Sequence, residues 1–307
     1  MKRSLSGIQP SGILHLGNYF GAMKQFIDTQ NSGEYDGFYF IADYHSLTSL
    51  TDPKALKDNT YNIVLDYLAL GLDPKKSTIF LQSDVPEHTE LSWLLSNVTP
   101  VGLLERGHSY KDKIAKGISP NTGLLTYPVL MAADILMYDT DVVPVGKDQK
   151  QHLEFARDIA MKFNQQYNVD LFKLPEPLIL DDSAIVPGTD GQKMSKSYGN
   201  TINMFASKKE LKKQVMSIVT DSTPLEDPKD PNNNVAKLYA LFASIEKQNE
   251  MKEKFLAGNY GYGHAKTEVL NAILEYFGEA RERREELAKD TDCLLYTSPS
   301  PRDPKTS

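Results

Sequence analysis

The sequence predicts an α/β domain with a mainly parallel sheet, followed by a smaller helical domain. Short apolar segments, such as 37–42 and 78–82, alternate with amphipathic segments such as 53–70, and this alternation is typical of parallel α/β folds. From about residue 205 onward the pattern is helical only. We therefore expect residues 1–204 to form the α/β domain and residues 205–292 the helical one.

The composition fits a globular protein with more than one domain. A chain of 307 residues, 40% of them hydrophobic, exceeds what a single core usually holds. No apolar run approaches a membrane span, and no signal-peptide apolar region follows Met1-Lys2-Arg3, so we expect a cytoplasmic protein without a membrane partner. Cys293 is the single cysteine, and the net charge of −7 argues against general DNA or RNA coating.

A glycine-rich loop is predicted directly after the first strand. Residues 3–6 fit the strand, and residues 7–12 (GIQPSG) let the backbone approach a ligand closely. A helix is expected from Gly17 to Ile27, and the N-terminus of a helix in such a turn suits a phosphate. An ordinary tight connection has the same pattern, so both interpretations stay open for this segment alone.

Polar side chains follow the strand predicted at residues 37–42. The strand has no alternation of polar and apolar residues, as expected when both faces are buried, and it ends in Asp43-Tyr44-His45. Ligands of open parallel sheets bind outside the carboxyl ends of the strands. These side chains are therefore candidates for a binding site.

An aspartate interrupts the apolar helix predicted from Thr122. Tyr127, Met131, Asp134 and Tyr138 are spaced by four, three and four residues, so they share one helix face. Burying a carboxylate without a partner costs several kcal/mol or more. Either this face meets water, or a donor binds Asp134. A strand at 142–145, a turn at 146–149 and a second helix from about Asp148 are predicted next.

Residues 188–199 predict a mobile, positively charged loop. Three glycines surround two lysines and two serines, a combination that can close over a polyphosphate. The segment 103–116, with Arg106, Lys111 and Lys113, fits a solvated helix better. In the C-terminal part, Ser207-x-x-Glu210 is a capping box, and further helices are predicted at 235–245, 249–256 and 264–287.

Two segments resemble the signatures of class I aminoacyl-tRNA synthetases: LHLGN at 14–18 and KMSKS at 193–197. Within that class the chain resembles the bacterial tryptophanyl-tRNA synthetases, through SGIQPSG at 6–12, LTYP at 125–128, MAADIL at 131–136 and VGKDQKQH at 145–152. The resemblance covers about residues 3–292. Asn18 replaces the usual final histidine of the first signature, a variant found within this family.

The resemblance implies a Rossmann-like catalytic domain, a shortened helical domain that binds the tRNA anticodon, and a homodimer. The implied partners are L-tryptophan, ATP with Mg²⁺, and tRNA(Trp). Tryptophan's carboxylate would attack the α-phosphate of ATP and release pyrophosphate. The adenylate would then be attacked by the 2′ hydroxyl of the tRNA's terminal adenosine.

The resemblance also implies site residues. The catalytic residues would be His15, Asn18, Lys193, Lys196 and Ser197. ATP would bind Gln9, Pro10, Ser11, Gly17, Asn18, Lys113, Gly146, Asp148, Lys193, Met194 and Lys196. Tryptophan would bind Gly7, His45, Tyr127, Met131, Asp134, Val145 and Gln149. No protein metal ligands are expected, because Mg²⁺ would sit mainly on phosphate oxygens.

Asp134 would determine specificity, because the indole N–H only donates and needs an acceptor. Sites of this hydrogen-bonding kind discriminate by about 10⁴–10⁵ without editing. The nearest competing interpretation is the tyrosine-specific sister enzyme. Its substrate phenol both donates and accepts, so a tyrosine and an aspartate are expected to bind it there. A relative that activates the amino acid but charges tRNA poorly, a silent RNA-binding relative and a nucleotidylyltransferase also stay open. The last gives no reason for the helical domain.

Residues 293–307 do not resemble the family. We expect this segment to be disordered or foreign to the reading frame, and the competing interpretation is a natural disordered terminus.

Overall fold

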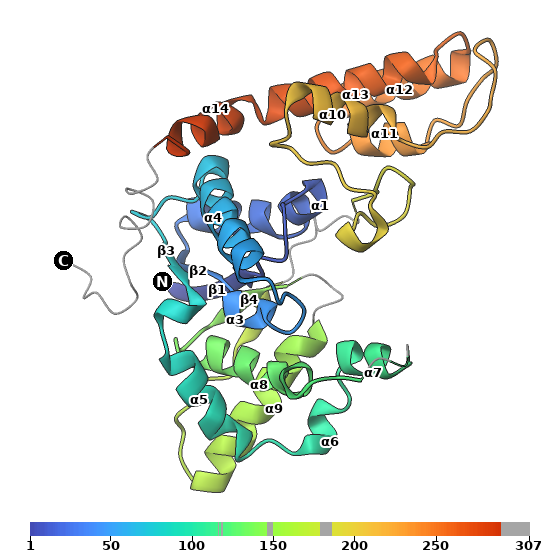
Figure 1. Ribbon diagram of the computed structural model, residues 1–307. Coiled ribbons are helices and arrows are strands. Elements are labelled where there is room, and N and C mark those ends of the chain that lie inside the picture. The colour runs from blue at the N-terminus through green and yellow to red at the C-terminus, as the bar shows by residue number, and fades with distance from the viewer. Residues whose placement is uncertain (116, 118, 146–149, 179–185, 290–307) are drawn as a thin grey trace. The chain divides into compact units, whose positions relative to one another are not determined.

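The computed structural model describes residues 1–115, 117, 119–145, 150–178 and 186–289 (Figure 1). The chain forms two compact units. The first comprises Met1–Ile13 and Lys24–Ser183, and the second comprises Leu14–Met23 and Ala184–Lys289. The predictions made for Gly146, Asp148, Gln149 and the segment 293–307 lie outside the described residues.

The first unit is built on a five-stranded parallel sheet, as the sequence predicts. The strand order is β3-β2-β1-β4-β5, and the pairs β1–β2, β1–β4, β2–β3 and β4–β5 are all parallel. The strands are β1 (Lys2–Ile8), β2 (Tyr35–Ile41), β3 (Thr78–Leu81), β4 (Val142–Pro144) and β5 (Glu176–Leu178). The α/β class is therefore confirmed.

Strand β2 lacks alternation because helices cover both of its faces. On one face Tyr39 stacks on Phe26, with 5.0 Å between ring centroids, and its hydroxyl donates to the Phe26 carbonyl. On the other face Phe38 and Phe40 belong to the main core. A strand buried on both sides favours a continuous apolar run, which is what residues 37–42 show.

Helices of the first unit lie on both sides of the sheet. They are α2 (Lys24–Ser32), α3 (Asp43–Ser46), α4 (Pro53–Leu70), α5 (Glu87–Ser96), α6 (Val101–Leu104), α7 (His108–Ala115), α8 (Thr122–Leu136) and α9 (Lys150–Tyr167), with a short 3₁₀ turn, η2 (Gln82–Asp84). In Figure 1, α4 lies on one side of the strands, and α5, α8 and α9 lie on the other. Helix α4 begins and ends as predicted, with Asp52 accepting from the Lys54 N–H and Gly71 in the left-handed region.

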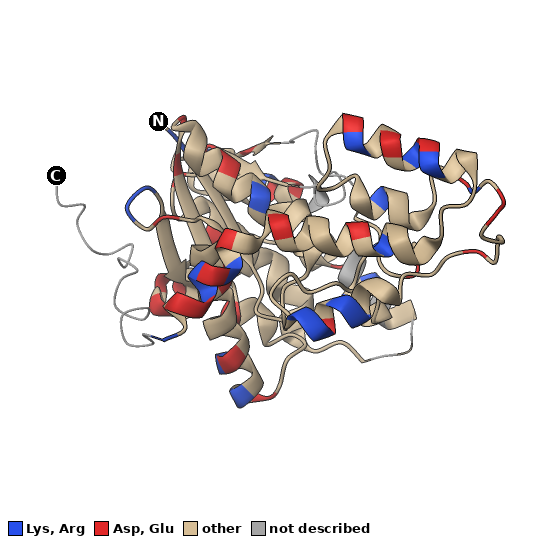
Figure 2. Cartoon of the chain, turned by 90° about the horizontal axis from the view of Figure 1, so that it is seen from above, with Lys and Arg blue, Asp and Glu red and all other residues tan. Residues whose placement is uncertain are grey.

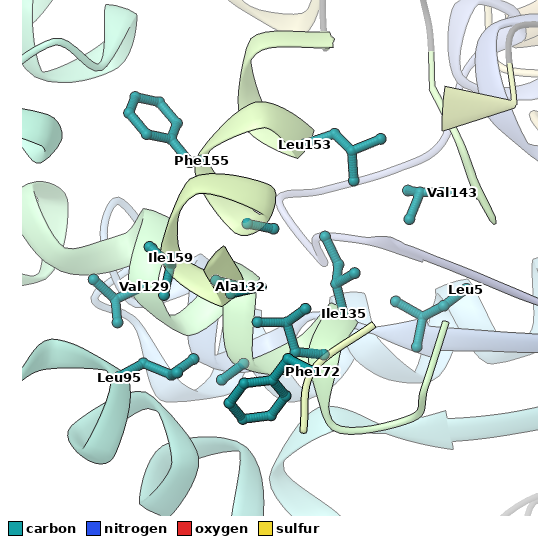
Figure 3. Packing of buried hydrophobic residues seen from close by; sticks show 14 of the residues in the cluster. Leu5, Leu95, Val129, Ala132, Ile135, Val143, Leu153, Phe155, Ile159 and Phe172 are labelled. Carbon is teal, nitrogen blue, oxygen red and sulfur yellow. The ribbon is translucent and has the colours of Figure 1, made fainter. Parts of the chain in front are cut away.

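The main core lies between the sheet and helices α5, α8 and α9 (Figure 3). Val129, Ala132 and Ile135 of α8 pack against Leu153 and Ile159 of α9. Small side chains such as Ala132, Ala133 and Ala156 are fully buried and allow close approach of the two helices. This packing fixes α8 beside the carboxyl ends of the strands.

The second unit contains helices and connecting loops. Its elements are α1 (Leu16–Asn18), a π-helical segment η1 (Tyr19–Met23), a 3₁₀ turn η4 (Lys196–Tyr198), α10 (Lys208–Met216), α11 (Asn234–Tyr239), α12 (Ile245–Ala257), α13 (Tyr262–Tyr276) and α14 (Gly278–Leu287). As predicted, Ser207 caps α10 by accepting from the Glu210 N–H. No helix among the described residues is both long enough and apolar enough to cross a bilayer.

Two predicted helices are interrupted. The helix expected from Gly17 to Ile27 instead passes through the π segment, and the helix expected at 264–287 breaks at Phe277. The two interruptions meet in one aromatic cluster of the second unit. Phe277 is 1% exposed and packs 4.9 Å from the ring of Tyr19, whose hydroxyl lies 3.1 Å from that of Tyr276.

The compact units are not divided at residue 204, where the sequence predicts the domain boundary. The division falls at 183/184, and Leu14–Met23 belongs to the second unit. Hydrogen bonds explain the second difference, because the Leu16 N–H donates to the Ile202 carbonyl over 3.0 Å. The assignment of an anticodon-binding function to residues 205–292 stays a prediction.

Candidate active site

Asp134 is a buried polar group of the first unit with several hydrogen-bond partners. Its residue is 1% exposed, and three side chains hold its carboxylate. Oδ1 accepts from Gln82 Nε2 at 2.7 Å and pairs with His88 Nδ1 at 2.7 Å. Oδ2 pairs with His45 Nε2 at 2.7 Å. Of the two possibilities open from the sequence, burial with donors is the observed one.

The partners of Asp134 come from the carboxyl ends of neighbouring strands. His45 lies on α3, directly after β2, and Gln82 is the first residue after β3. The two strand ends are tied together, since the Ser83 N–H donates to Asp43 Oδ1 over 3.0 Å. His88 lies at the start of α5. Parallel pairing therefore gathers these polar groups at the sheet edge where ligands bind in such folds.

These contacts keep Asp134 ionised. Burial raises the pKa of Asp134, and the hydrogen bonds and charges of His45 and His88 lower it by more, so the net shift is downward. At neutral pH the group is a carboxylate, which can only accept hydrogen bonds. Toward any further partner this group can therefore act only as a hydrogen-bond acceptor.

A pocket of about 320 Å³ opens beside this network. His45 and Tyr127, two side chains predicted to bind tryptophan, line it, and their rings meet edge to face at 6.5 Å. The other lining residues are Tyr44, Leu47, Thr48, Thr89, Ser92, Asn121, Gly123, Thr126 and Leu130. Asp134 does not line the pocket but is joined to it through His45.

The other described residues predicted for tryptophan have packing roles in this structure. Val145 is buried in the main core, and its N–H donates to the Leu178 carbonyl over 3.3 Å. Met131 packs against the same core. Gly7 lies opposite Phe40 in the β1–β2 register, and a Cβ at Gly7 would come within 2.7 Å of the Phe40 ring. Their contact with tryptophan stays a prediction.

The two signature segments meet within the second unit. The Gly17 N–H donates to Met194 Sδ over 3.4 Å, and a Cβ on Gly17 would lie 3.0 Å from the His15 ring and 3.3 Å from the Met194 Cβ. A side chain at position 17 would therefore crowd the His15 and Met194 side chains. Asn18 Oδ1 accepts from the His15 N–H over 3.1 Å, which caps the start of α1. The first and second signatures thus form one structural element.

Two titratable groups of this element, His15 and Lys196, carry perturbed pKa values. Burial, and then the positive charge of Lys196, lower the pKa of His15 from 6.5 to about 4. Burial lowers the pKa of Lys196. His15 is therefore neutral at pH 7 and can act toward a phosphate as a hydrogen-bonding group rather than as a cation.

Asn200 holds the second signature in place, although it was not among the residues predicted from the sequence. It is 2% exposed. Its Oδ1 accepts from the Ser195 N–H at 2.8 Å, and its Nδ2 donates to Asp190 Oδ1 at 2.7 Å and to the Lys193 carbonyl at 3.2 Å. Ser195 and Ser197 hydroxyls lie 2.9 Å apart. The loop is thus ordered by specific contacts.

The remaining residues predicted for ATP are placed as follows. Gln9, Pro10 and Ser11 belong to the first unit, in a tight turn where the Ser11 N–H donates to the Gln9 carbonyl over 2.8 Å. The Pro10 carbonyl accepts from Asn59 Nδ2 over 3.1 Å. Lys113 lies on α7. Among the described residues, no group of three or more His, Cys, Asp or Glu side chains could hold a metal ion.

Local sequence signals point to three site residues that were not predicted. Gln82 is a polar residue that directly follows a buried strand, and His88 follows Pro86 at a helix start. Asn200 follows Gly199, whose φ of 65° is the left-handed conformation expected after a short turn. The partner of Gln82 and His88 is Asp134, 52 and 46 residues away, and Asn200 bonds across its own loop. The sequence alone does not reveal these pairs.

Comparison with known proteins agrees with this geometry. The family model described as "tRNA synthetases class I (W and Y)" matches residues 2–278. The chain is 84% identical over 294 residues to a tryptophan–tRNA ligase of Fusobacterium nucleatum, covering 96% of this chain and 90% of that one. A Campylobacter jejuni tryptophan–tRNA ligase is 55% identical over 293 residues, with 95% and 91% covered.

Solved structures give the same result. Tryptophanyl-tRNA synthetase from Campylobacter jejuni, complexed with ADP and tryptophan, superposes with a TM-score of 0.89 at 53% identity, covering 96% of this chain and 92% of that one. The enzyme from Mycoplasma pneumoniae gives a TM-score of 0.78 at 34% identity, with 97% and 92% covered. The chain therefore belongs to the class I tRNA synthetases of the W and Y family, in the bacterial tryptophanyl branch.

Proposed function

We propose that this chain is a tryptophan–tRNA ligase. It activates L-tryptophan with ATP to form tryptophanyl-adenylate and pyrophosphate, and it then transfers the amino acid to tRNA(Trp). The relatives named above support this reaction, since they include a tryptophan–tRNA ligase that is 84% identical. The Campylobacter relative holds tryptophan and ADP together. We propose that this chain likewise binds tryptophan together with an adenine nucleotide, and that its nucleotide substrate is ATP.

Asp134 is the observation on which the choice of amino acid rests. It is a buried carboxylate, and its partners among the described residues use only part of its acceptor capacity. The indole N–H is a donor only and satisfies such an acceptor. A side chain without this donor would leave a buried acceptor unpaired, which penalises binding. We propose that His45 and Tyr127, beside Asp134, contact the amino acid as well.

The two signatures provide the groups for ATP. We propose that His15, Gly17 and Asn18 bind ATP together with Gln9, Pro10 and Ser11, and that Lys113, Gly146 and Asp148 complete the site. Lys193, Lys196 and Ser197 stabilise the departing pyrophosphate. Phosphoryl-type displacement needs mainly positioning and charge stabilisation, which these side-chain types supply. Mg²⁺ enters with ATP on its phosphate oxygens.

The macromolecular partners are tRNA(Trp) and a second copy of the chain. Helix α10 exposes Lys208, Lys209, Lys212 and Lys213, and lysines of this kind bind phosphates. Blue and red segments alternate along several helices in Figure 2, so the basic side chains gather only in local patches.

Trp93 is 72% exposed, next to Leu94 on α5. We propose that this apolar surface is the contact between two copies of the chain in a homodimer. We also propose that the enzyme is cytoplasmic.

Pyrophosphate exchange with separate amino acids tests the proposal. The chain is incubated with ATP, labelled pyrophosphate and either L-tryptophan or L-tyrosine. We expect exchange with tryptophan to exceed exchange with tyrosine by about 10⁴-fold or more in kcat/KM. Faster exchange with tyrosine would identify the sister enzyme. Stoichiometric tRNA binding without any exchange would identify a silent RNA-binding relative.

A further inference from the structure

A chain of three side chains, the half-buried Tyr138 and the buried His88 and Asp134, ends on Asp134. His88 is fully buried, at 0% exposure. Its Nδ1 lies 2.7 Å from Asp134 Oδ1, and its Nε2 lies 2.9 Å from the Tyr138 hydroxyl. The rings of Phe40 and Phe80 each lie with centroids 6.1 Å from the imidazole. His88 is thus held at both nitrogens and packs against two aromatic rings.

The direction of these hydrogen bonds follows from their chemistry. The Asp134 carboxylate only accepts, so His88 Nδ1 carries a hydrogen and donates to it. In the tautomer that carries its hydrogen on Nδ1, Nε2 is an acceptor and can receive the Tyr138 O–H. The contact with Tyr138 therefore favours the tautomer of His88 that donates to Asp134.

The acceptor positions of Asp134 can be counted. A carboxylate has about four lone-pair positions, two on each oxygen. Gln82 and His88 occupy both positions on Oδ1, and His45 occupies one on Oδ2. Gln82 turns its Nε2 to the carboxylate although its Oε1 is left buried without a partner among the described residues. Within the described part of the chain, one position on Oδ2 is left for a further donor.

We propose that His88, fixed by Tyr138, is a positioning residue that orients Asp134 so that a single Oδ2 lone pair is offered to the substrate side chain. This inference rests on the proposed function and assigns a second layer to its specificity. Without His88, Oδ1 regains an open acceptor position and the carboxylate can rotate. Selection for a side chain with one N–H donor then weakens.

Two matched variants separate positioning from packing. His88→Asn places an amide N–H near the Nδ1 position and keeps the donor to Asp134. His88→Gln places its amide near the Nε2 position and loses that donor. A third variant, Tyr138→Phe, removes only the hydroxyl that orients the ring. Pyrophosphate exchange is measured with L-tryptophan and with β-(benzothiophen-3-yl)-L-alanine, in which sulfur replaces the indole N–H.

We expect His88→Gln to lower kcat/KM for tryptophan by about tenfold or more, with a much smaller change for the benzothienyl analogue. The ratio of the two therefore falls. His88→Asn should retain most of the ratio, and Tyr138→Phe should lower it by a smaller factor. A residue that only fills the core would change both substrates equally.

Parallel losses for both substrates, or equal ratios in His88→Asn and His88→Gln, would overturn the proposal. If His88→Gln does not fold, Tyr138→Phe decides, and an unchanged ratio in that variant refutes the role. Wild-type chain without tryptophan-dependent exchange would instead refute the proposed function, whatever the variants do.

Discussion

At the scale of single residues, burial determines the charge of the site groups. Asp134 stays ionised at 1% exposure because neighbouring histidines donate to it. His15 is kept neutral because burial and Lys196 both oppose its protonation. The first group can accept from an indole and the second can hydrogen-bond a phosphate without adding a charge. Lys196 then supplies the cationic charge beside His15.

The titration of His15 can be predicted with its sign. The folded-state pKa, about 4, lies below 6.5, so the unfolded chain binds the proton more readily. The contribution of neutral, buried His15 to the stability of the folded chain is therefore complete above pH 6.5, and it is lost as the pH falls toward 4. NMR titration of the His15 ring should give a pKa near 4. Lys196→Ala should raise it, though not fully to 6.5, because burial is the larger cause.

The His15 prediction has a control in a second variant. Lys209→Ala removes an exposed cation of α10 that is not a cause of the His15 shift, and it should leave the pKa of His15 unchanged. A His15 pKa near 6.5 in the wild-type chain would contradict the burial of the ring. An unchanged value in Lys196→Ala would contradict the coupling between the two signatures.

At the scale of elements, most helices and strands could be predicted from the sequence, but their interruptions could not. Helix α4 and the strands β2 and β3 were predicted to within about two residues, since their caps and apolar runs are local signals. The burial of Phe277 against Tyr19, at the break between α13 and α14, is a contact between residues distant in sequence, which the helical pattern does not reveal. Likewise Asp134 was singled out from its helix, whereas its partners Gln82 and His88 required the sheet topology.

The loop of the second signature is an element whose order depends on one side chain. Asn200→Ala removes one bond to the Ser195 N–H and two donated by its amide, to Asp190 and Lys193. We expect the rate of pyrophosphate exchange to fall on the order of tenfold. Binding of tryptophan, measured by equilibrium dialysis, should stay unchanged, because the proposed tryptophan residues belong to the first unit.

Asn232→Ala is the matched control for that experiment, since Asn232 is exposed in another loop of the same unit. Its exchange rate should equal that of the wild-type chain. Equal rates in Asn200→Ala and Asn232→Ala would show that the contacts of Asn200 do not support catalysis.

At the scale of the whole molecule, the two compact units hold different groups. The Asp134 network belongs to the first unit, and both signatures, with His15 and Lys196, belong to the second. The sequence order hides this division, because the first signature precedes most of the first unit in the chain. It joins the second unit through Ile202 and Met194.

Helix α10 of the second unit should contribute to tRNA binding only. Lys209→Ala combined with Lys212→Ala removes two exposed cations, so the salt dependence of tRNA binding should weaken by about one logarithmic unit of slope per lysine. Filter binding at several salt concentrations measures this slope. Lys54→Ala with Lys57→Ala, on the exposed face of α4, is the control. An unchanged slope in the α10 variant would exclude the helix from the tRNA contact.

The central claim is that Asp134 recognises the indole N–H of tryptophan. A crystal structure of the chain with bound L-tryptophan tests it most directly. We expect the indole nitrogen about 2.7–3.2 Å from Asp134 Oδ2, with Gln82 and His88 still on Oδ1. An indole nitrogen that pairs with another acceptor, or a tryptophan bound away from Asp134, would contradict the claim.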